Sequence, residues 1–429
     1  MKRKVLFISL AVVLALSIGL IGCDGDGVEG PSGMAYIGGT FPLTGPYPED
    51  GAAVLEAFQN YAAWVNANDK ISPWGPAFPE DIVLNVTFLD DGANPATAST
   101  NYATMMAAGY KQFRVSGSGI ATAMRDTLIT DEVAATTMAS GPYLVTPSVG
   151  TIFSNYPIYT DQMAAVADWF MASWTGNVSP RVAYLTNDSF GQTLKTTAMD
   201  NYLTGKGYTL VTGCPAVPTV PANPGATASM LTWCQNNTID LTLGAMLVVG
   251  ASMTMTQADS MGIGVGQAYE MQIGLCSPAH LTIYLRDTGA PGTIIGDGLV
   301  IAGSYPPWTD TGDGVTFCKT LMNAYKSGGF VNTEHIMYQH GVVEAMIQTE
   351  AIRLALAATG KLDPADLTTA EVLNSGFKQI SSLNTGGIIP TTITYGAGDV
   401  EGAETVRLDQ AVSGADVHLG NYPLRHVYS

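Results

Sequence analysis

Short apolar runs alternate with helix-period stripes along the chain, beginning at residue 36. A buried strand is expected at 36–41, a Pro/Gly turn at 42–48 and an amphipathic helix at 51–67. The helix is predicted because its apolar residues recur at i, i+3, i+4 and i+7. These residues are Val54, Leu55, Phe58, Tyr61, Ala62 and Val65. We expect Asp50 to be the N-cap of this helix and the strand–helix pair to open a parallel βαβ unit.

Further strand and helix patterns follow and fall into two series. In the first, strands are expected at 82–89, 112–115 and 134–139, with helices at 94–108 and 120–131. In the second, strands at 181–186, 208–212, 241–249 and 271–275 alternate with helices at 160–174, 193–205, 226–236 and 253–261. Later helices are expected at 314–327, 337–359 and 364–374, and terminal strands at 391–412. This alternation predicts an α/β fold with doubly wound parallel sheets.

Two such series predict two lobes joined by three crossings, the first two near 154–158 and 304–308. The predicted organisation is a leader at 1–23, a tether at 24–33, lobe I at 34–155 plus 308–385, and lobe II at 156–307 plus 386–429. A cleft between two hinged lobes can bury a small ligand from both sides. Ligands of open α/β sheets bind beyond the carboxyl ends of the strands, so the loops at those ends are the candidate site.

Three strand-end loops offer groups suited to a ligand. The loop 44–47, which includes Tyr47, follows the first strand, although an ordinary turn explains it equally well. The loop SGSG at 116–119 precedes a helix, and its hydroxyls and free backbone N–H groups suit a carboxylate. Ser140 and Gly141 form a similar loop. For both of these loops, a Gly-rich turn with a Ser cap is the alternative.

The N-terminus has the pattern of a bacterial lipoprotein signal peptide. A basic stretch at 2–4 precedes an uncharged apolar run at 5–21, and LIGC at 20–23 matches a lipobox. We therefore predict cleavage before Cys23 and lipidation of its thiol. An uncleaved transmembrane anchor is the competing interpretation, and both place the body outside the cytoplasm, in a periplasm or on the cell surface. The polar, Gly-rich stretch 24–33 is expected to be a flexible tether.

Charge and motifs exclude several function classes. The chain of 429 residues has a formal charge of −18 and a pI of about 4.4. All 36 acidic but only 15 of the 18 basic residues lie beyond the leader, so the mature chain carries about −21. This charge argues against nucleic-acid partners and against binding to anionic lipid. No G-x-S-x-G, P-loop or H-E-x-x-H motif occurs. We therefore expect no enzymatic activity, no cofactor and no metal site.

Four cysteines remain in the mature body. Cys214 and Cys234 bracket the Pro-rich stretch 215–224, and a disulfide between them would fasten that loop. We predict this disulfide. A second bridge between Cys276 and Cys318 is less favoured, because the two residues fall in different predicted lobes.

Several segments resemble one known family. They are IGGTFPLTGP at 37–46, FLDDGANPA at 88–96, NDSFGQ at 187–192, YQHGVVEA at 338–345 and GIIPTTITY at 387–395. In this order and spacing they resemble the periplasmic branched-chain amino acid-binding proteins, which are type I solute-binding proteins of ABC transporters. The resemblance implies a type I periplasmic binding fold in which hinge closure traps the ligand.

The resemblance also implies ligand contacts. Ser118, Gly119, Ser140 and Gly141 would bind the ligand carboxylate, and Phe190 stands where the family has an aromatic contact, usually Tyr. Simple packing between the lobes is the alternative for Phe190. Tyr47, Tyr305 and Trp308 offer further aromatic walls, although a structural role is favoured for each. His340 is expected to be a packed helix residue.

Two departures bear on the ligand. Cys276 or Ser277 stands where amino acid-binding members usually carry Glu, and Ala251 replaces an aromatic residue after a glycine turn at 250–252. A buried ammonium group without a counter-charge is costly. Asp188 could supply that charge, or it could cap the next helix. The ligand is therefore expected to be an amino acid or a small organic or aromatic acid, with acids that lack an α-amino group as serious candidates.

The predicted function is that of an extracytoplasmic solute-binding lipoprotein that serves an ABC permease. The alternative is a ligand-sensing receptor lipoprotein without a transport role. A hydrolase on the same scaffold is a third class, which only turnover of esters or amides would support.

Overall fold

The computed structural model describes residues 33–45, 48–138, 141, 150–186, 191–217, 223–246, 248–276, 296–325, 335–396, 398–413 and 415–427. The chain divides into a segment Met1–Gly30 and a body Pro31–Ser429. The predicted signal peptide, Cys23 and most of the tether lie outside the described residues. Within the described ranges, no helix has the length and apolar character needed to cross a bilayer.

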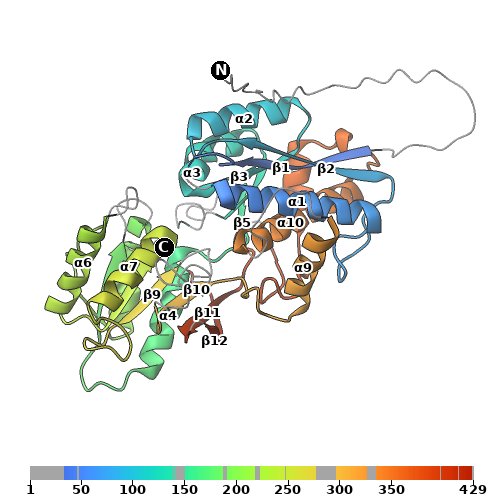
Figure 1. Cartoon of the computed structure of the whole chain (residues 1–429). Coiled ribbons are helices and arrows are strands. Elements are labelled where there is room, and N and C mark those ends of the chain that lie inside the picture. Colours follow the sequence, from blue (N-terminus) through green and yellow to red (C-terminus); the bar gives the residue numbers. More distant parts are fainter. Residues whose placement is uncertain are drawn as a thin grey trace, which may run out of the picture. The chain divides into compact units, whose positions relative to one another are not determined.

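The first sheet contains, among the described residues, five parallel strands in the order β2-β1-β3-β4-β5. They are β1 (Gly33–Phe41), β2 (Ile82–Asp90), β3 (Gln112–Val115), β4 (Ala134–Thr137) and β5 (Ile152–Ser154). Its helices are α1 (Pro48–Asn68), α2 (Pro95–Ala107), α3 (Gly117–Thr130), α9 (Asp313–Tyr325) and α10 (Ile336–Thr359). Figure 1 shows α2 and α3 on one face of this sheet and α1 and α10 on the other. We call this sheet and its helices the first lobe.

The second sheet has the order β12-β11-β10-β9-β8-β6-β7 in the described part of the chain. Its parallel strands are β6 (Arg181–Thr186), β7 (Thr209–Leu210), β8 (Leu241–Ala245), β9 (Gln272–Cys276) and β10 (Val300–Gly303). The antiparallel strands β11 (Thr405–Val412) and β12 (Ala415–Pro423) complete one edge. The helices are α4 (Tyr159–Ser173), α5 (Thr197–Gly205), α6 (Pro224–Asn236) and α7 (Val248–Ser260), with a 3-10 turn η2 (Gly191–Leu194).

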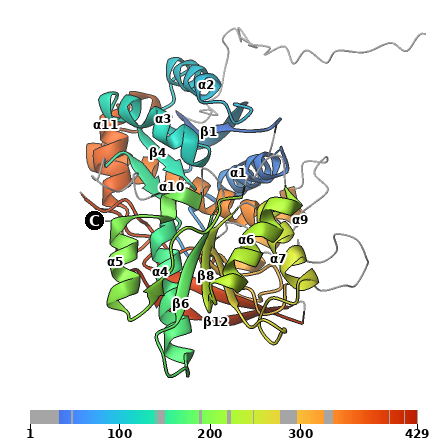
Figure 2. The ribbon, with the colours of Figure 1, turned by 90° about the vertical axis from the view of Figure 1, so that its left-hand side faces the viewer.

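Helices cover both faces of this second sheet as well. Figure 2 shows α4 and α5 on one side of β6 and β8, and α6 and α7 on the other. Two separate apolar cores fill these layers. We call this sheet and its helices the second lobe. The predicted fold class, two doubly wound α/β lobes, is confirmed.

The chain passes between the two sheets after β5, after β10 and again before β11. Before the last passage, short turns follow α10: η3 (Pro364–Asp366), α11 (Thr369–Glu371), η4 (Val372–Gly376) and η5 (Phe377–Gln379). Ser154, the last residue of β5, pairs with Glu401 of the returning segment in an isolated parallel bridge. The predicted limits of the two lobes, 34–155 plus 308–385 and 156–307 plus 386–429, stay predictions.

The structure corrects three local predictions. Helix α1 begins at Pro48, so Asp50 lies in its first turn and pairs with His335 at 3.1 Å instead of capping the helix. The expected turn at 250–252 is part of α7. The terminal strands begin at Thr405, and β12 was missed because its residues are mostly exposed and show no buried alternating face. Backbone pairing with β11, which a hydropathy pattern does not record, holds β12 in place.

Candidate functional site

The carboxyl ends of four strands meet at one edge of the first sheet. β1 pairs in parallel with β2 and β3, and β3 pairs with β4 so that Val115 lies opposite Thr137. Ser116 and Met138, the residues directly after these two strands, therefore lie at the same edge. This is the position at which open α/β sheets bind their ligands.

Asp91 ties three of these strand ends together. Its carboxylate is 1% exposed and accepts hydrogen bonds from Thr40 Oγ1 at 2.9 Å and Ser116 Oγ at 2.6 Å through the same oxygen. The other oxygen accepts the backbone N–H of Ala93 at 2.8 Å. Because the Ser116 hydroxyl is committed to Asp91, the side chain of this N-cap residue does not bond to the first N–H groups of α3. Backbone N–H groups at a helix N-terminus are suited to bind an anion.

Asp90 holds the turn that follows β1. Its carboxylate accepts the backbone N–H groups of Leu43 at 2.9 Å, Gly92 at 2.9 Å and Thr44 at 3.2 Å, together with the Thr44 hydroxyl. Burial acts to raise the pKa of Asp90, but these hydrogen bonds outweigh it and lower the pKa below its ordinary value. The turn is thus fixed by an ionised carboxylate at the candidate site.

Three of the predicted first-lobe contacts fall on described residues. Ser118 and Gly119 lie in the first turn of α3, the former partly exposed and the latter exposed. A Cβ atom at Gly119 would meet nothing within 4 Å, so the backbone there is open to an incoming group. Gly141 is buried just beyond β4. The remaining predicted positions in these loops and in the opposing loops, Tyr47, Ser140, Phe190 and Ser277, lie outside the described residues.

The two second-lobe contacts on described residues are in the apolar core. Ala251 lies within α7 and Cys276 ends β9, and each is 0% exposed. Each belongs to one of the two second-lobe cores. Burial raises the pKa of the Cys276 thiol, which is therefore neutral. Ala251 was expected in a turn, and its helical position explains why its side chain packs inward.

A buried ion pair lies directly behind the β3 end. Arg114 Nε is 2.7 Å from Glu344 Oε2 on α10, and both side chains are 0% exposed. The guanidinium also lies 4.2 Å from the centre of the Phe41 ring and donates to Thr40 O at 3.4 Å. Burial acts to raise the pKa of Glu344, but Arg114 and then His340 bring it below its ordinary value. The carboxylate is thus ionised and paired.

The same network reaches two of the crossings between the lobes. His340 Nε2 lies 3.3 Å from Glu344 Oε2, and His340 Nδ1 lies 2.8 Å from the Tyr305 hydroxyl. Tyr305 in turn accepts a hydrogen bond from Asn155 Nδ2 at 2.9 Å. The expectation that His340, Tyr305 and Trp308 are packed residues is confirmed, since they are 2%, 2% and 4% exposed. One local signal for this network was not used in the sequence analysis, the i, i+4 spacing of His340 and Glu344 on an apolar helix.

The predicted Cys214–Cys234 disulfide is absent from the structure. All four cysteines among the described residues carry free thiols. Cys214 and Cys234 do meet, and a hydrogen bond between their thiols lowers the pKa of Cys214 and raises that of Cys234. The predicted disulfide is therefore not formed, although the two thiols lie close enough to shift each other's pKa. Cys276 and Cys318 are each fully buried and unbridged.

Comparison with known proteins identifies the family. A family model described as Periplasmic binding protein matches residues 35–397. A branched chain amino acid ABC transporter protein from Thermus thermophilus with bound valine has a TM-score of 0.74 at 16% identity, covering 92% of this chain and 97% of that chain. No curated protein matches the sequence with significance.

Two further solved structures are similar over all or nearly all of their length. A substrate binding protein of an ABC transporter from Aeropyrum pernix has a TM-score of 0.73 at 15% identity, covering 93% of this chain and 100% of its own. A fatty acid ABC transporter substrate-binding protein from Thermomonospora curvata has a TM-score of 0.71 at 14% identity. The match covers 93% of this chain and 95% of that protein. These likenesses confirm the fold, and the family match spans most of the sequence. The chain therefore belongs to the periplasmic binding protein family of extracytoplasmic solute-binding proteins.

Proposed function

We propose that the chain is the solute-binding component of an ABC importer and that it captures a small carboxylate-bearing ligand by closure of its two lobes. The observation that carries this proposal is the N-terminus of α3, where the Ser116 hydroxyl is held by Asp91 at 2.6 Å and the exposed Gly119 leaves the first turn open. The N–H groups and dipole of this helix would receive the carboxylate. Ser118, Ser140 and Gly141 would complete that contact, and Tyr47, Phe190 and Ser277 would line the remainder of the site.

We further propose that the preferred ligand lacks an α-amino group. Cys276 stands near the place where the amino acid-binding relatives carry a carboxylate, and its buried, neutral thiol supplies no negative charge. An ammonium group enclosed there would lose its hydration without gaining an ion pair. The similar Thermomonospora curvata protein, described as binding fatty acids, is a precedent for an amino-free carboxylate on this fold.

The signal-peptide pattern supports a lipid anchor at Cys23. Such an anchor would hold the protein at the membrane beside its permease. Metabolic labelling with a tagged fatty acid should label the wild-type chain and fail to label Cys23→Ala. Labelling of the variant would refute the anchor without affecting the proposal on the ligand.

The ligand class can be tested by a thermal-shift panel. We expect aromatic and aliphatic carboxylates such as benzoate and octanoate to raise the melting temperature, and their amides to have no effect. Leucine and valine should act more weakly than the best amino-free acid. A large shift with leucine and none with amino-free acids would refute the ligand class. No shift with any carboxylate would refute the proposed function.

A single substitution tests the place of binding. Gly119→Asp puts a negative charge at the α3 N-terminus. This charge interacts favourably with the helix dipole but repels a bound carboxylate. We expect the variant to melt no lower than wild type when free and to bind the best carboxylate at least tenfold more weakly, a loss of about 1.4 kcal/mol. Gly225→Asp, at the exposed N-terminus of α6 in the second lobe, is the matched control and should bind normally. Equal affinity of the two variants would refute the site.

A further inference from the structure

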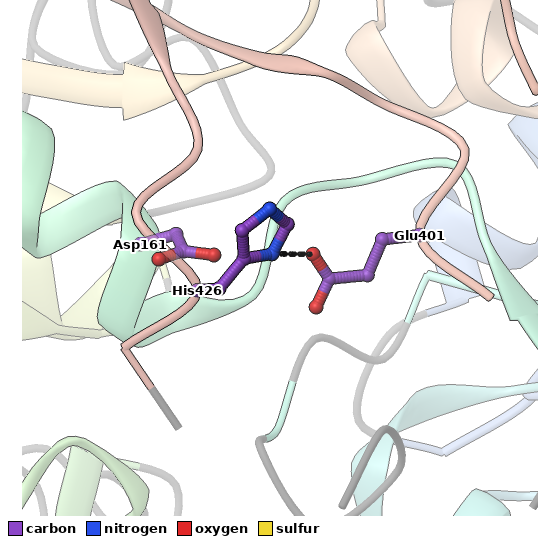
Figure 3. A group of neighbouring side chains, drawn as sticks. All are labelled: Asp161, Glu401 and His426. Carbon is purple, nitrogen blue, oxygen red and sulfur yellow. Dashed lines mark ion pairs between the residues drawn. The ribbon is translucent and has the colours of Figure 1, made fainter. Parts of the chain in front are cut away.

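Three side chains from distant parts of the second-lobe chain converge near two of the crossings. Asp161 lies in the first turn of α4, Glu401 lies on the segment that leads to β11, and His426 follows β12. One donor atom from each residue lies within 4.8 Å of the other two. Figure 3 shows the imidazole of His426 between the two carboxylates, with Nδ1 3.9 Å from Glu401 Oε2.

Glu401 is a buried carboxylate that lacks donors. Its side chain is 4% exposed, and neither of its oxygens has a hydrogen-bond partner among the described residues. The ion-pair contact with His426, at 3.9 Å, is longer than a hydrogen bond. Three further acidic residues, Asp161, Asp399 and Glu404, place negative charge near this carboxylate. A buried carboxylate in this position is unfavourable unless a cation satisfies it.

Asp161 divides its carboxylate between two roles. Oδ1 accepts the backbone N–H of Arg425 at 3.2 Å and that of Val427 at 2.9 Å, the residues on either side of His426. These bonds hold the tail so that the His426 ring faces the acids (Figure 3). Oδ2 is buried without a hydrogen-bond partner in the described part of the chain. One oxygen therefore positions the histidine, and the other is left for a further ligand.

We propose that Asp161, Glu401 and His426 form a binding site for a divalent transition-metal ion, with Zn²⁺ as the best-fitting probe. One imidazole nitrogen with two carboxylates is a donor set that Zn²⁺ accepts, whereas Ca²⁺ and Mg²⁺ prefer oxygen ligands throughout. His426 is 58% exposed on its side chain, so water can complete the coordination. Donors about 2.1 Å from one ion are at most about 4.2 Å apart, so the group contracts slightly on binding.

The ion would fasten the connections between the lobes. Ser154 at the end of β5 donates to Val400 O at 2.8 Å and accepts from Gly402 N at 2.7 Å, on either side of Glu401. Asp161 follows the first crossing, and His426 belongs to the C-terminal tail. A bound ion thus joins the start of α4, the returning segment and the tail. The site is separate from the α3 N-terminus, and its existence does not depend on the proposed solute.

Metal titration of the untagged full chain, stripped with EDTA and dialysed, tests the proposal. We expect calorimetry to show one saturable Zn²⁺ site per chain, a higher melting temperature with Zn²⁺, and binding of Ca²⁺ at least tenfold weaker. Glu401→Gln and His426→Ala should each weaken Zn²⁺ binding at least tenfold. Glu404→Gln and His418→Ala, which remove a neighbouring charge and the histidine beside Asp409, are matched controls and should bind like wild type.

The outcomes separate the site from other sources of binding. Metal-free Glu401→Gln should melt no lower than wild type, because the amide relieves charge repulsion with Asp161; this shows that the variant is folded. Zn²⁺ bound by the free thiols would persist in both ligand variants. Equal binding by wild type, Glu401→Gln and His426→Ala, or no saturable binding by wild type, would overturn the proposal.

Discussion

The two lobes share a topology but differ at the carboxyl ends of their strands. In the first lobe, Thr40, Asp91 and Ser116 form a hydrogen-bonded set across three strand ends. In the second, β8 and β9 end at Ala245 and Cys276, both fully buried in an apolar core, while Thr186 at the end of β6 accepts one hydrogen bond, from Gln192 Nε2 at 3.1 Å. This difference shows that topology decides where a site lies, whereas the residues decide which lobe supplies the polar contacts. It supports a division in which the first lobe binds the charged group and the second covers it.

The two sheets also differ in the contacts that lie inside them, behind the strand ends. The first sheet is supported by the fully buried ion pair between Arg114 and Glu344. Among the described parallel strands of the second sheet, an interior contact is the neutral hydrogen bond from Thr242 Oγ1 to Gln272 O at 3.3 Å, whereas an ion pair of this sheet, Arg407 with Asp409 at 2.7 Å, lies on the antiparallel strand β11. Charges buried in pairs are costly to separate, while a neutral bond contributes little.

Glu344→Gln should therefore have the largest effect on stability. The variant leaves the Arg114 guanidinium buried without its counter-charge, and we expect a loss of about 3–5 kcal/mol in the free energy of unfolding. Thr242→Val in the second sheet should cost only about 1 kcal/mol. Chemical denaturation measures both values. Similar losses of unfolding free energy for the two variants would show that the interior contacts of the two lobes do not differ in strength.

Low pH should reduce the contribution of Glu344 to the free energy of unfolding. The pKa of this carboxyl group is lowered in the folded chain from its usual 4.5, so its stabilising contribution is complete above that value. The contribution is lost as the pH falls through the folded pKa, because protonation then breaks the pair with Arg114. The stability gap between wild type and Glu344→Gln should narrow steadily below about pH 4.5. A gap that stays constant down to pH 3 would show that the charge of Glu344 does not stabilise the fold.

Removal of a helix cap should give the smallest loss of stability among these variants, and the loss should be the same in the two lobes. Asn94 caps α2 by accepting from Ala96 N and Thr97 N, and Asn223 caps α6 by accepting from Ala226 N. Substitution of either asparagine by Ala should cost about 1 kcal/mol in unfolding free energy. Thermal denaturation of the two variants provides the comparison. A loss of unfolding free energy in only one of the two variants would mean that the lobes also differ in their polar contacts at the surface.

The local pattern of apolar and polar residues predicted most of the fold. The strand at Gln112–Val115 was placed at its observed limits, and the apolar stripe of α1 was identified because buried faces repeat with the helical period. The pattern was misleading after β8, where an apolar run continues from the strand into α7 and hides the boundary at Ala245. It was silent for β12, which is exposed and held by backbone pairing.

The candidate sites were predictable only in part. The loop at 116–119 carries its signal locally, as glycines and serines before a helix. Arg114 and Glu344 are 230 residues apart, and neither one alone indicates a buried pair. Asp161, Glu401 and His426 likewise come from three separate segments without any metal-binding spacing. Such groups are brought together by the fold, so the sequence alone predicted no metal site.

We propose above all that the two lobes close over a carboxylate bound at the α3 N-terminus. Small-angle X-ray scattering tests it most directly, with wild type and Gly119→Asp measured with and without the panel carboxylate that most raises the melting temperature. We expect the radius of gyration of wild type to fall on addition of that acid and to stay unchanged for Gly119→Asp at the same concentration. An unchanged radius for wild type at saturation, or an equal decrease in both proteins, would contradict this account.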